Sequence, residues 1–445
     1  MSILDDISQA FDPSPLPAGS AVYVDCRAVR GGSDILVELG KKVQRSDRTC
    51  QLYSGHRGGG KSTELLRLQA ELDRKGCFVV YFAAEDGDIN PEDVEYTDIL
   101  LACTRHLLES LKSVDPEPVS NWLRDRWQAL NEVLQTEINV SDLKTEVLIQ
   151  QIAKITANIR AQPSQRYQIC QLLNPHTETL VVALNQFIAA AKRKLPQGKT
   201  KLVVIADGLD KITPIVQDGG RTNHDEIFID RAEQLKALDC HVIYTVPISL
   251  VLSNRASDLM EIYNCVPHVL PMVMVQTRTN EAHSLGVAAL KEIVRSRIQS
   301  IASAKKLSLE TAIFDNPGTL NHLCLITGGH VRNLILLMQL AIDYNDDNLP
   351  LRATAVQQGI RQLRTTYRTT VNSDQWILLA KVFRTKRIEH DTTHRSLLFT
   401  RCLLEYCEDD GDGERWHDVH PMLRDVPEFK DALAAYDRST AHHEP

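Results

Sequence analysis

The chain has 445 residues, of which 43% are hydrophobic and 24% charged, and its formal net charge is −8 at pH 7. This length suits two or three domains, and the near-average composition excludes disordered, collagenous and fibrous proteins. The apolar runs are too short to cross a bilayer, and the first residues lack the pattern of a secretory signal. We therefore expect a cytoplasmic protein without a membrane segment, whose overall acidity excludes coating of nucleic acid along its whole surface.

Residues 1–47 are expected to form an N-terminal lead-in, in which the turn-rich DPSPLPAGS precedes AVYVDCRAV, a short strand or a docking segment. A strand-like run at 48–54 closes on Gly55. The next segment, residues 61–75, has the periodicity of a helix and is followed by Gly76, a typical helix stop.

Further apolar runs of strand length lie at residues 77–84, 201–209 and 240–247, and a fourth lies within 266–275. Continuous runs of this kind are typical of central strands in a parallel sheet that is covered on both faces. Because helical segments separate them, the pattern predicts an α/β fold with a parallel sheet, in a core domain spanning residues 48–275.

A long helical stretch, at about residues 92–198, separates the second and third of these strands. A crossover between parallel strands needs only a dozen or so residues, so this stretch is expected to be a helical insertion. Two interpretations stay open, namely extra packing for the sheet and a module that binds or senses a partner.

The remainder of the chain is expected to be mainly helical. Residues 276–345 have helical periodicity and are interpreted as a helical lid, and a polar linker at 345–352 follows. Residues 353–433 read as helices and then a hairpin around the turn signal EDDGDG, which indicates a winged-helix-like domain. Residues 434–445 are left as a tail.

The strongest chemical signal matches the phosphate-binding pattern G-x-x-x-x-G-K-S/T in full. Glycines suit such a loop because Cβ atoms would keep its backbone N–H groups away from a phosphate. The lysine reaches the β- and γ-phosphates, and the following serine hydroxyl coordinates Mg²⁺. The residues are Gly55, His56, Arg57, Gly58, Gly59, Gly60, Lys61, Ser62 and Thr63.

A second signal is the apolar run LVVIADGLD, which carries Asp207 where a buried strand ends. Ligands bind at this edge of parallel sheets, so we expect Asp207 to hold Mg²⁺ together with Ser62. Asp210 is the next carboxylate and is expected to orient the attacking water. The alternative is that Asp210 only caps a turn or pairs with Lys211.

GHRGGGKST together with VVIADGLDK resembles the P-loop ATPases of the AAA+ class and the related signal-transduction (STAND-type) ATPases. Many AAA+ proteins carry two adjacent acids where this chain has Asp207 and glycine. The resemblance implies that Thr245, in HVIYTVP, is a sensor beside the γ-phosphate. It also implies that Arg332, in GGHVRNLILLMQLA, contacts the nucleotide from the lid.

The same resemblance implies that Tyr23 and Asp25 flank the adenine, and that a homo-oligomer completes each site with an arginine from a neighbouring subunit. The candidates for that arginine are Arg221, Arg231 and Arg255. Each assignment has a plainer alternative: Thr245 as a strand former, and Arg332 as a surface residue of a helix. A winged helix after the lid is common among origin-recognition-like and transposition-regulator-like relatives.

Residues 352–401 contain ten basic and three acidic side chains, a net charge of +7 in an acidic protein. Such a cluster favours contact with nucleic acid backbones, and Arg361, Arg364 and Arg368 are its central members. The expected wing, CEDDGDGER, is acidic, which instead favours a protein-docking role.

Ten cysteines are scattered along the chain without a CxxC pair, so we expect free, mostly buried thiols. One concentration of metal-type ligands has spacings that match no common zinc pattern. Its members are His390, His394, Cys402, Cys407, His417 and His420.

These signals predict slow or regulated hydrolysis of ATP to ADP and phosphate with Mg²⁺. The resemblance implies a switch whose nucleotide state controls self-assembly or coupling to a partner effector protein, as in bacterial antiviral defence. The alternatives are a DNA-dependent ATPase of replication initiation, transposition or remodelling, and a nucleotide-bound scaffold without turnover.

Overall fold

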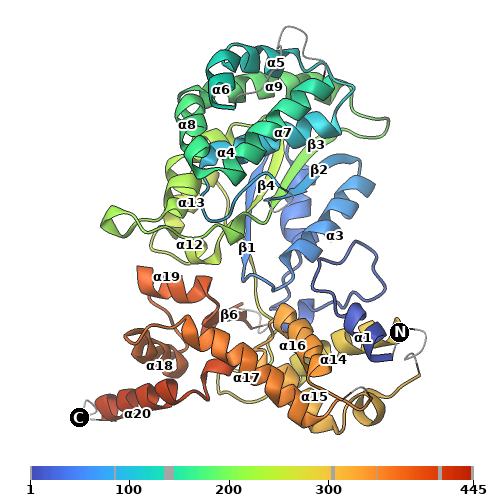
Figure 1. The fold of residues 1–445 in the computed structure, drawn as a ribbon, viewed down its shortest axis with the longest axis vertical. Coiled ribbons are helices and arrows are strands. Elements are labelled where there is room, and N and C mark those ends of the chain that lie inside the picture. The colour runs from blue at the N-terminus through green and yellow to red at the C-terminus, as the bar shows by residue number, and fades with distance from the viewer. Residues whose placement is uncertain are drawn as a thin grey trace. The chain divides into compact units, whose positions relative to one another are not determined.

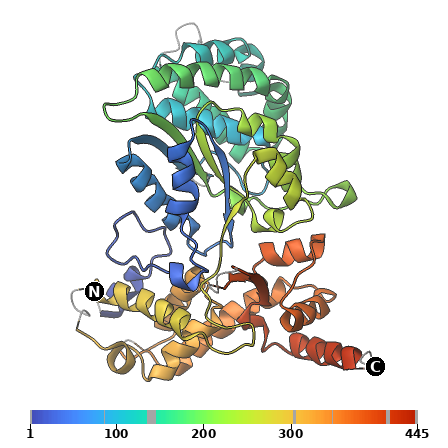
Figure 2. The same ribbon diagram turned by 180° about the vertical axis from the view of Figure 1, so that it is seen from behind.

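The computed structural model describes residues 3–84, 87–134, 145–301, 306–346, 348–408 and 413–441 (Figures 1 and 2). The chain divides into two compact units. Unit 1 comprises Met1–Asp34, Gly55–Leu66 and Val269–Pro445, and unit 2 comprises Ile35–Ser54 and Arg67–His268. The domain boundaries expected from the sequence stay predictions.

A five-stranded sheet with the order β2-β3-β4-β1-β5 is the centre of the α/β fold. The pairs β1–β4, β2–β3 and β3–β4 are parallel. β3 and β4 are buried almost throughout, which explains why their sequences are continuous apolar runs. The strands are β1 (Cys50–Gly55), β2 (Cys77–Ala83), β3 (Lys201–Asp207), β4 (His241–Thr245) and β5 (His268–Leu270). The expected fold class is confirmed.

The register of the sheet aligns the polar residues at its carboxyl edge. Ala83 is opposite Asp207, and Tyr53 is opposite Thr245. Ala206 pairs with Tyr244, so Asp207 and Thr245, each one residue further, are level with each other. Two of the residues that we singled out in the sequence therefore lie at the same edge, on neighbouring strands.

The helical insertion is confirmed and belongs to unit 2, where its helices gather around one another at the top of Figure 1. α4 packs on α7 and β2, and α5 packs on α9. Arg166 is buried and pairs with Asp98 at 3.1 Å, and the buried Asp88 binds Arg105 and His106. The helices are α4 (Tyr96–Ser110), α5 (Glu117–Arg124), α6 (Trp127–Leu134), α7 (Thr145–Ala161), α8 (Pro163–Leu173) and α9 (Thr177–Arg193).

Unit 2 also has short helices outside the insertion, among them η2 (Leu36–Gly40) and α2 (Lys41–Arg45), which precede β1. The chain between β3 and β4 contains the 3-10 turn η5 (Leu209–Lys211) and the short helix α11 (Ala232–Lys236). After β4 come α12 (Ile248–Val251) and α13 (Ala256–Tyr263).

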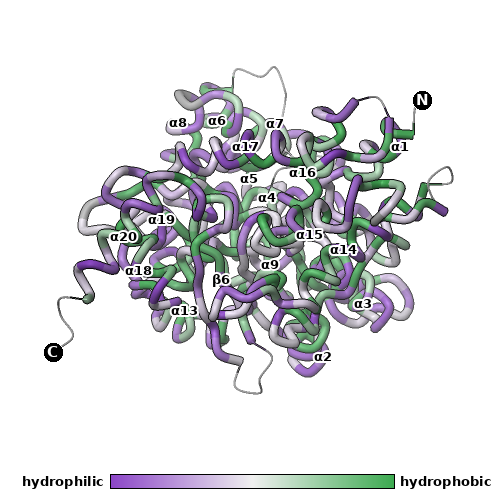
Figure 3. The backbone as a smooth tube through the Cα atoms, turned by 90° about the horizontal axis from the view of Figure 1, so that it is seen from below, coloured by the Kyte–Doolittle hydropathy of each residue, from purple (hydrophilic) through white to green (hydrophobic). Residues whose placement is uncertain are grey.

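Unit 1 contains the lid helices and the winged-helix-like part. The lid helices are α14 (Ser284–Gln299), α15 (Pro317–Ile326) and α16 (Val331–Asp343), and α17 (Ala353–Thr369) is the first helix of the winged-helix-like part. α18 (Gln375–Thr385), α19 (Thr392–Phe399), the antiparallel strands β6 (Leu403–Cys407) and β7 (Arg415–Val419), and α20 (Pro427–Ala441) follow. The acidic tip of this hairpin, residues 409–412, lies outside the described residues. Along the helices the tube in Figure 3 alternates between hydrophobic and hydrophilic colours, as expected for helices with one buried face.

The lead-in forms no strand within its described residues; residues 1–34 belong to unit 1 and residues 35–47 to unit 2. α1 (Ile3–Ala10) packs on α14 and α16, and the 3-10 turn η1 (Arg27–Val29) follows a loop. The carbonyl of Val29 accepts a hydrogen bond from Met274 N at 2.9 Å. AVYVDCRAV is therefore a docking segment, the second of the two structures considered for it.

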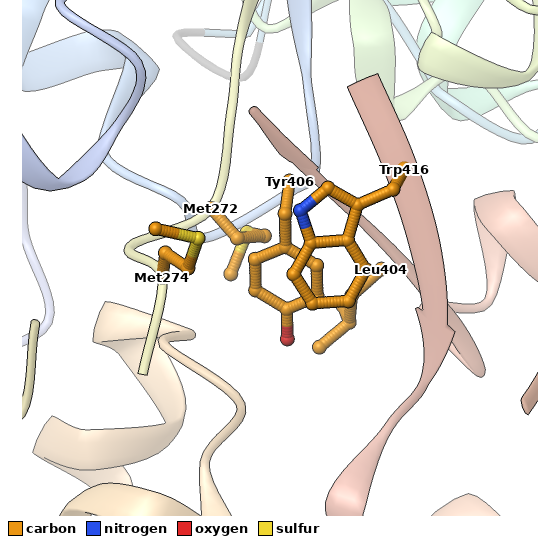
Figure 4. Packing of buried hydrophobic residues seen from close by; sticks show 5 residues of the cluster. All are labelled: Met272, Met274, Leu404, Tyr406 and Trp416. Atoms are coloured by element: carbon orange, nitrogen blue, oxygen red, sulfur yellow. The ribbon is translucent and has the colours of Figure 1, made fainter. Parts of the chain in front are cut away.

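The β6–β7 hairpin is anchored in unit 1 by a buried apolar cluster (Figure 4), made of Met272, Met274, Leu404, Tyr406 and Trp416. The Tyr406 and Trp416 rings stack with centroids 4.6 Å apart. The Tyr406 hydroxyl donates to Gly328 O at 2.8 Å, and Met272 N donates to Glu405 O at 3.0 Å. The hairpin is therefore held against the segment that follows β5 and the turn that precedes α16.

All ten cysteines are free, and eight of them are buried. Across the described ranges, no three His, Cys, Asp or Glu side chains are arranged to hold a metal ion. Among the helices of those same residues, none combines the length and the apolar character that crossing a membrane requires.

The turn before α16 yields a prediction about stability. Gly329 has φ +82°, and a Cβ there would lie 1.7 Å from Val273 O. We expect Gly329→Ala to lower the free energy of unfolding by about 4 kcal/mol or more, because backbone must move. Gly19 has a similar φ of +77° but open space around it. Gly19→Ala is therefore the matched control and should cost only about 1–2 kcal/mol. Urea unfolding followed by circular dichroism measures both, and equal losses would contradict the steric argument.

Candidate nucleotide-binding site

The phosphate-binding motif forms a loop between β1, which ends at Gly55, and α3 (Lys61–Arg74). Gly55, Gly58 and Gly60 have φ values of +144°, +78° and +108°, a region that only glycine adopts readily. A Cβ on Gly55 would also lie 2.7 Å from Leu270 O. The glycines are thus required by the backbone conformation of the loop itself.

Lys61 is buried, and its ammonium group is held by the loop. Nζ donates to Gly55 O at 2.7 Å and to His56 O at 2.9 Å. A buried ammonium group at the first residue of a fourteen-residue helix adds to the positive end of the helix dipole. The arrangement favours an anion, and phosphates are the anions that such a loop and helix start bind best.

Three consecutive carbonyl oxygens of the loop accept hydrogen bonds from distant segments of unit 1. One donor comes from the lead-in, and two come from the start of α16. The pairs are Arg57 O with His330 Nε2 at 2.6 Å, Gly58 O with Arg332 N at 3.1 Å, and Gly59 O with Arg30 Nη2 at 2.7 Å.

Two buried histidines belong to this arrangement. His56 Nε2 accepts a hydrogen bond from Glu405 N of β6 at 2.9 Å. Burial lowers the pKa of His56 well below its usual range, and the neighbouring His330 and Lys61 lower it further. Burial also lowers the pKa of His330 well below its usual range. Its Nδ1 accepts from Asn333 N at 3.1 Å, so the neutral ring carries its hydrogen on Nε2 and donates to the loop.

The remaining motif residues, Arg57, Ser62 and Thr63, also belong to unit 1. Arg57 stacks its guanidinium group over the Phe399 ring, 3.9 Å from its centroid. The Thr63 hydroxyl accepts a hydrogen bond from Leu16 N at 3.1 Å. Ser62 lies in the first turn of α3.

Tyr23 and Asp25 also belong to unit 1. The Tyr23 hydroxyl donates to Glu64 of α3 at 3.1 Å, which places this ring beside the helix that follows the loop. The Asp25 carboxylate is exposed and pairs with Arg27 at 2.6 Å. Arg332 is exposed, and its backbone, described above, contacts the loop.

Unit 2 holds the residues expected at the carboxyl edge of the sheet. Asp207 is buried and accepts hydrogen bonds from the Tyr81 hydroxyl at 2.8 Å and from Gly208 N at 2.7 Å. The buried Thr245 hydroxyl accepts from Leu209 N at 2.9 Å. Asp210 is buried in the adjoining turn η5. Thr245 thus braces the turn that carries both carboxylates.

The arginines considered as trans-acting residues have partners in their own unit. Arg221 and Arg255 both form ion pairs with Asp230. Arg231 lies over the Tyr96 ring, 5.4 Å from its centroid.

Much of the basic window at residues 352–401 is neutralised inside unit 1. Within the described residues, six of its ten basic side chains form ion pairs, five of them with acids that follow or precede the window in sequence. The pairs are Arg352–Asp346, Arg364–Asp425, Arg368–Glu428, Lys381–Glu389, Arg384–Asp437 and Lys386–Asp418. The net charge of +7 therefore overstates the charge available to a nucleic acid.

Arg30, His330 and Glu405 are residues of this site that sequence reasoning missed. Arg30 lies five residues beyond Asp25, and His330 lies two residues before Arg332. The sequence carried one usable signal, because the pattern leaves positions 58 and 59 free and this chain has glycine at both. A Cβ on Gly58 would lie 2.5 Å from the His330 ring, so that extra glycine marks a close approach.

No protein-family model matches the chain, and no curated protein matches it. Among solved structures, it is similar to the ORC2 protein of Aeropyrum pernix in ADPNP–ADP complexes, with 10% identity, 97% of this chain and 98% of that chain covered, and a TM-score of 0.43. It is also similar to a Walker-type ATPase of Pyrococcus abyssi, with 14% identity, 96% and 99% covered, and a TM-score of 0.38. Cdc6p from Pyrobaculum aerophilum is similar as well, with 12% identity, 96% of this chain and 98% of that chain covered, and a TM-score of 0.36.

The buried His56 gives a prediction about pH. Its pKa is lower in the folded chain than the usual value near 6.5, so the unfolded chain binds the extra proton. Stability contributed by the neutral ring is therefore lost as the pH falls below about 6.5. His56→Gln keeps an acceptor for Glu405 N but removes the titration. We expect it to reduce the loss of unfolding free energy between pH 6.5 and 5 by about 1 kcal/mol per pH unit.

Urea unfolding at several pH values measures this slope. His322→Gln, at an exposed position of α15, is the control and should leave the slope unchanged. Identical slopes for His56→Gln and the unmodified chain would contradict a neutral, buried His56.

Proposed function

We propose that the chain binds ATP at residues 55–63 and hydrolyses it slowly to ADP and phosphate, as an AAA+/STAND-like switch. The observation that carries the proposal is the loop between β1 and α3, with left-handed glycines and a buried Lys61 at the helix start. Its backbone N–H groups and its lysine are the chemistry that a triphosphate requires.

The residues suit Mg²⁺ as a companion of the nucleotide. Ser62 supplies a hydroxyl oxygen and Asp207 a carboxylate oxygen, and Mg²⁺ prefers oxygen ligands. Asp207 is buried at the carboxyl edge of the sheet, the edge at which β1 also ends. When bound, Mg²⁺ would neutralise negative charge on the phosphate oxygens. In this proposal Lys61 and the loop N–H groups bind phosphate, and Ser62 and Asp207 hold the metal.

Asp210, Thr245 and Arg332 are proposed to respond to the γ-phosphate. Asp210 is the candidate for orienting the attacking water. Thr245 ties the turn carrying Asp207 and Asp210 to β4, so it is suited to report a change in that turn. The Arg332 backbone is bonded to Gly58 O, which supports a contact between its side chain and the nucleotide. Tyr23, beside α3, is the candidate for the adenine, and we extend this role to Asp25.

We propose that the nucleotide state controls self-assembly, with Arg221, Arg231 or Arg255 acting on a neighbouring copy, or controls coupling to an effector protein. A defence role follows only from the resemblance of the motifs. The ion pairs within residues 352–401 favour this switch over a DNA-dependent ATPase, because they reduce the charge available to phosphate backbones.

Lys61→Ala removes the charge that the loop directs at the phosphates. We expect ATP affinity to fall about 30-fold or more, as for loss of a buried charged contact worth about 2 kcal/mol or more.

Asp207→Asn should retain nucleotide binding but abolish Mg²⁺-dependent phosphate release. Lys75→Ala, at an exposed lysine paired with Glu71, is the control. Fluorescent-nucleotide titration and phosphate-release assays measure these effects, and unchanged release in both variants would leave only a scaffold role.

The switch also predicts the size of the assembly. The mass measured with ATP and Mg²⁺ should exceed the mass measured with ADP or without nucleotide. Lys61→Ala should keep the nucleotide-free mass under every condition. One mass in all three states would contradict the switch, and a larger species that forms only with added duplex DNA would favour the DNA-dependent alternative.

A further inference from the structure

The peptide planes of the phosphate-binding loop are held from outside. In a trans peptide, the C=O of one residue and the N–H of the next point in opposite directions. The one cis peptide among the described residues is Leu349–Pro350, so the loop peptides are trans. The donors hold the carbonyl groups of Arg57, Gly58 and Gly59. In each of these peptides the N–H of the next residue therefore points away from the donor.

Of the N–H groups so turned, those of Gly58 and Gly60 have the direction that a phosphate needs. Gly59 N donates back into the loop, to His56 O at 3.1 Å. The Gly58 and Gly60 N–H groups flank it, and they point to the side opposite His330 and Arg30, respectively. The external donors thus set the face of the loop that binds an anion, without standing on that face.

Arg30 is the most unusual of the three donors. It is 6% exposed, and within the described residues no carboxylate forms an ion pair with it. Its Nε is buried without a hydrogen-bond partner. The neighbouring Cys26 thiol supplies no negative charge, because burial raises its pKa. A buried, uncompensated guanidinium group is costly, and an anion bound nearby would offset that cost.

The backbone around Arg30 keeps this side chain in place. Val29 O is bonded to Met274 N, and the next residue, Gly31, has φ +64°. A Cβ on Gly31 would lie 2.5 Å from Cys407 Sγ of β6. The position of the guanidinium group is thus set by the segment after β5 and by the hairpin. A charged donor on Gly59 O also polarises the peptide and makes Gly60 N–H a stronger donor.

We propose that Arg30 and His330 are positioning residues for nucleotide binding, which orient and polarise the loop peptides 57–58 and 59–60 toward the phosphates. This inference rests on the proposed function, since the anion is taken to be a nucleotide phosphate. Arg30 supplies a charge as well as a hydrogen bond, whereas His330 supplies a neutral hydrogen bond from a ring held by Asn333 N.

The test uses the full chain with substitutions that separate hydrogen bond from charge. Arg30→Met removes both, Arg30→Gln keeps a neutral donor, and Arg30→Lys keeps a charged donor. We expect ATP affinity to fall about tenfold to 100-fold in Arg30→Met, the range for a lost hydrogen bond to a charged group. Arg30→Gln should recover part of this loss and Arg30→Lys most of it.

His330 is tested in the same way. His330→Ala should weaken ATP binding about threefold to tenfold, the range for a neutral hydrogen bond, and His330→Gln should restore part of it. Arg74→Met and His322→Gln, at exposed positions, are the controls and should bind ATP like the unmodified chain.

A second readout needs no nucleotide. Hydrogen–deuterium exchange of the peptide covering residues 55–62 should be several-fold faster in Arg30→Met and His330→Ala than in the controls. If the unmodified chain fails to bind ATP, the proposed function fails, and the exchange rates still decide whether the donors hold the loop. Unchanged exchange together with unchanged affinity would overturn the inference.

Thermal unfolding separates a positioning role from a merely structural one. Arg30→Met removes a buried charge that has no counter-ion, which offsets the hydrogen bond lost at Gly59 O, so the nucleotide-free midpoint should change little while ATP affinity falls. A lower midpoint with the affinity unchanged would assign Arg30 to stability alone and would overturn the proposal.

Discussion

A loop that binds phosphate through backbone N–H groups must turn its carbonyl oxygens the other way, and buried carbonyls require donors. In unit 1, residues from distant segments supply the donors for these carbonyl groups. Its donors come from the lead-in, through Arg30, and from the start of α16, through His330 and Arg332 N. This is a physical reason why Met1–Asp34, Gly55–Leu66 and Val269–Pro445, three segments far apart in the sequence, form one compact unit.

The same loop is linked to the winged-helix-like part. His56, buried and neutral, accepts a hydrogen bond from Glu405 N, while Glu405 O accepts one from Met272 N. The apolar cluster of Figure 4 surrounds this link and holds β6 in place. Under the proposed function, a change in the loop on nucleotide binding would reach the backbone of β6 through the hydrogen bond between His56 and Glu405 N.

Prediction from the sequence succeeded where the signal is local. The strands were predicted because continuous apolar runs report burial on both faces, and the loop was predicted because its glycines are demanded by its own dihedral angles. Prediction failed where a side chain acts on distant backbone. Arg30 and His330 carry no local pattern, because their partners are backbone carbonyl groups of residues 57–59. Every residue has such a carbonyl group whatever its side chain, so the sequence does not mark it. The charge that residues 352–401 leave unpaired could not be predicted for a related reason, because Asp425, Glu428 and Asp437 meet these residues only after folding.

The sequence by itself determined the glycine-rich loop before α3, the parallel sheet with Asp207 at its carboxyl edge, and the helical insertion between β2 and β3. Each follows from neighbouring residues, through periodicity, glycine dihedral angles or apolar runs. Only the tertiary structure decided which donors satisfy the loop carbonyls, which histidines are buried and neutral, and how much positive charge stays available on residues 352–401. Those properties depend on desolvation and on contacts between residues far apart in the chain, and both come into existence only when the chain packs.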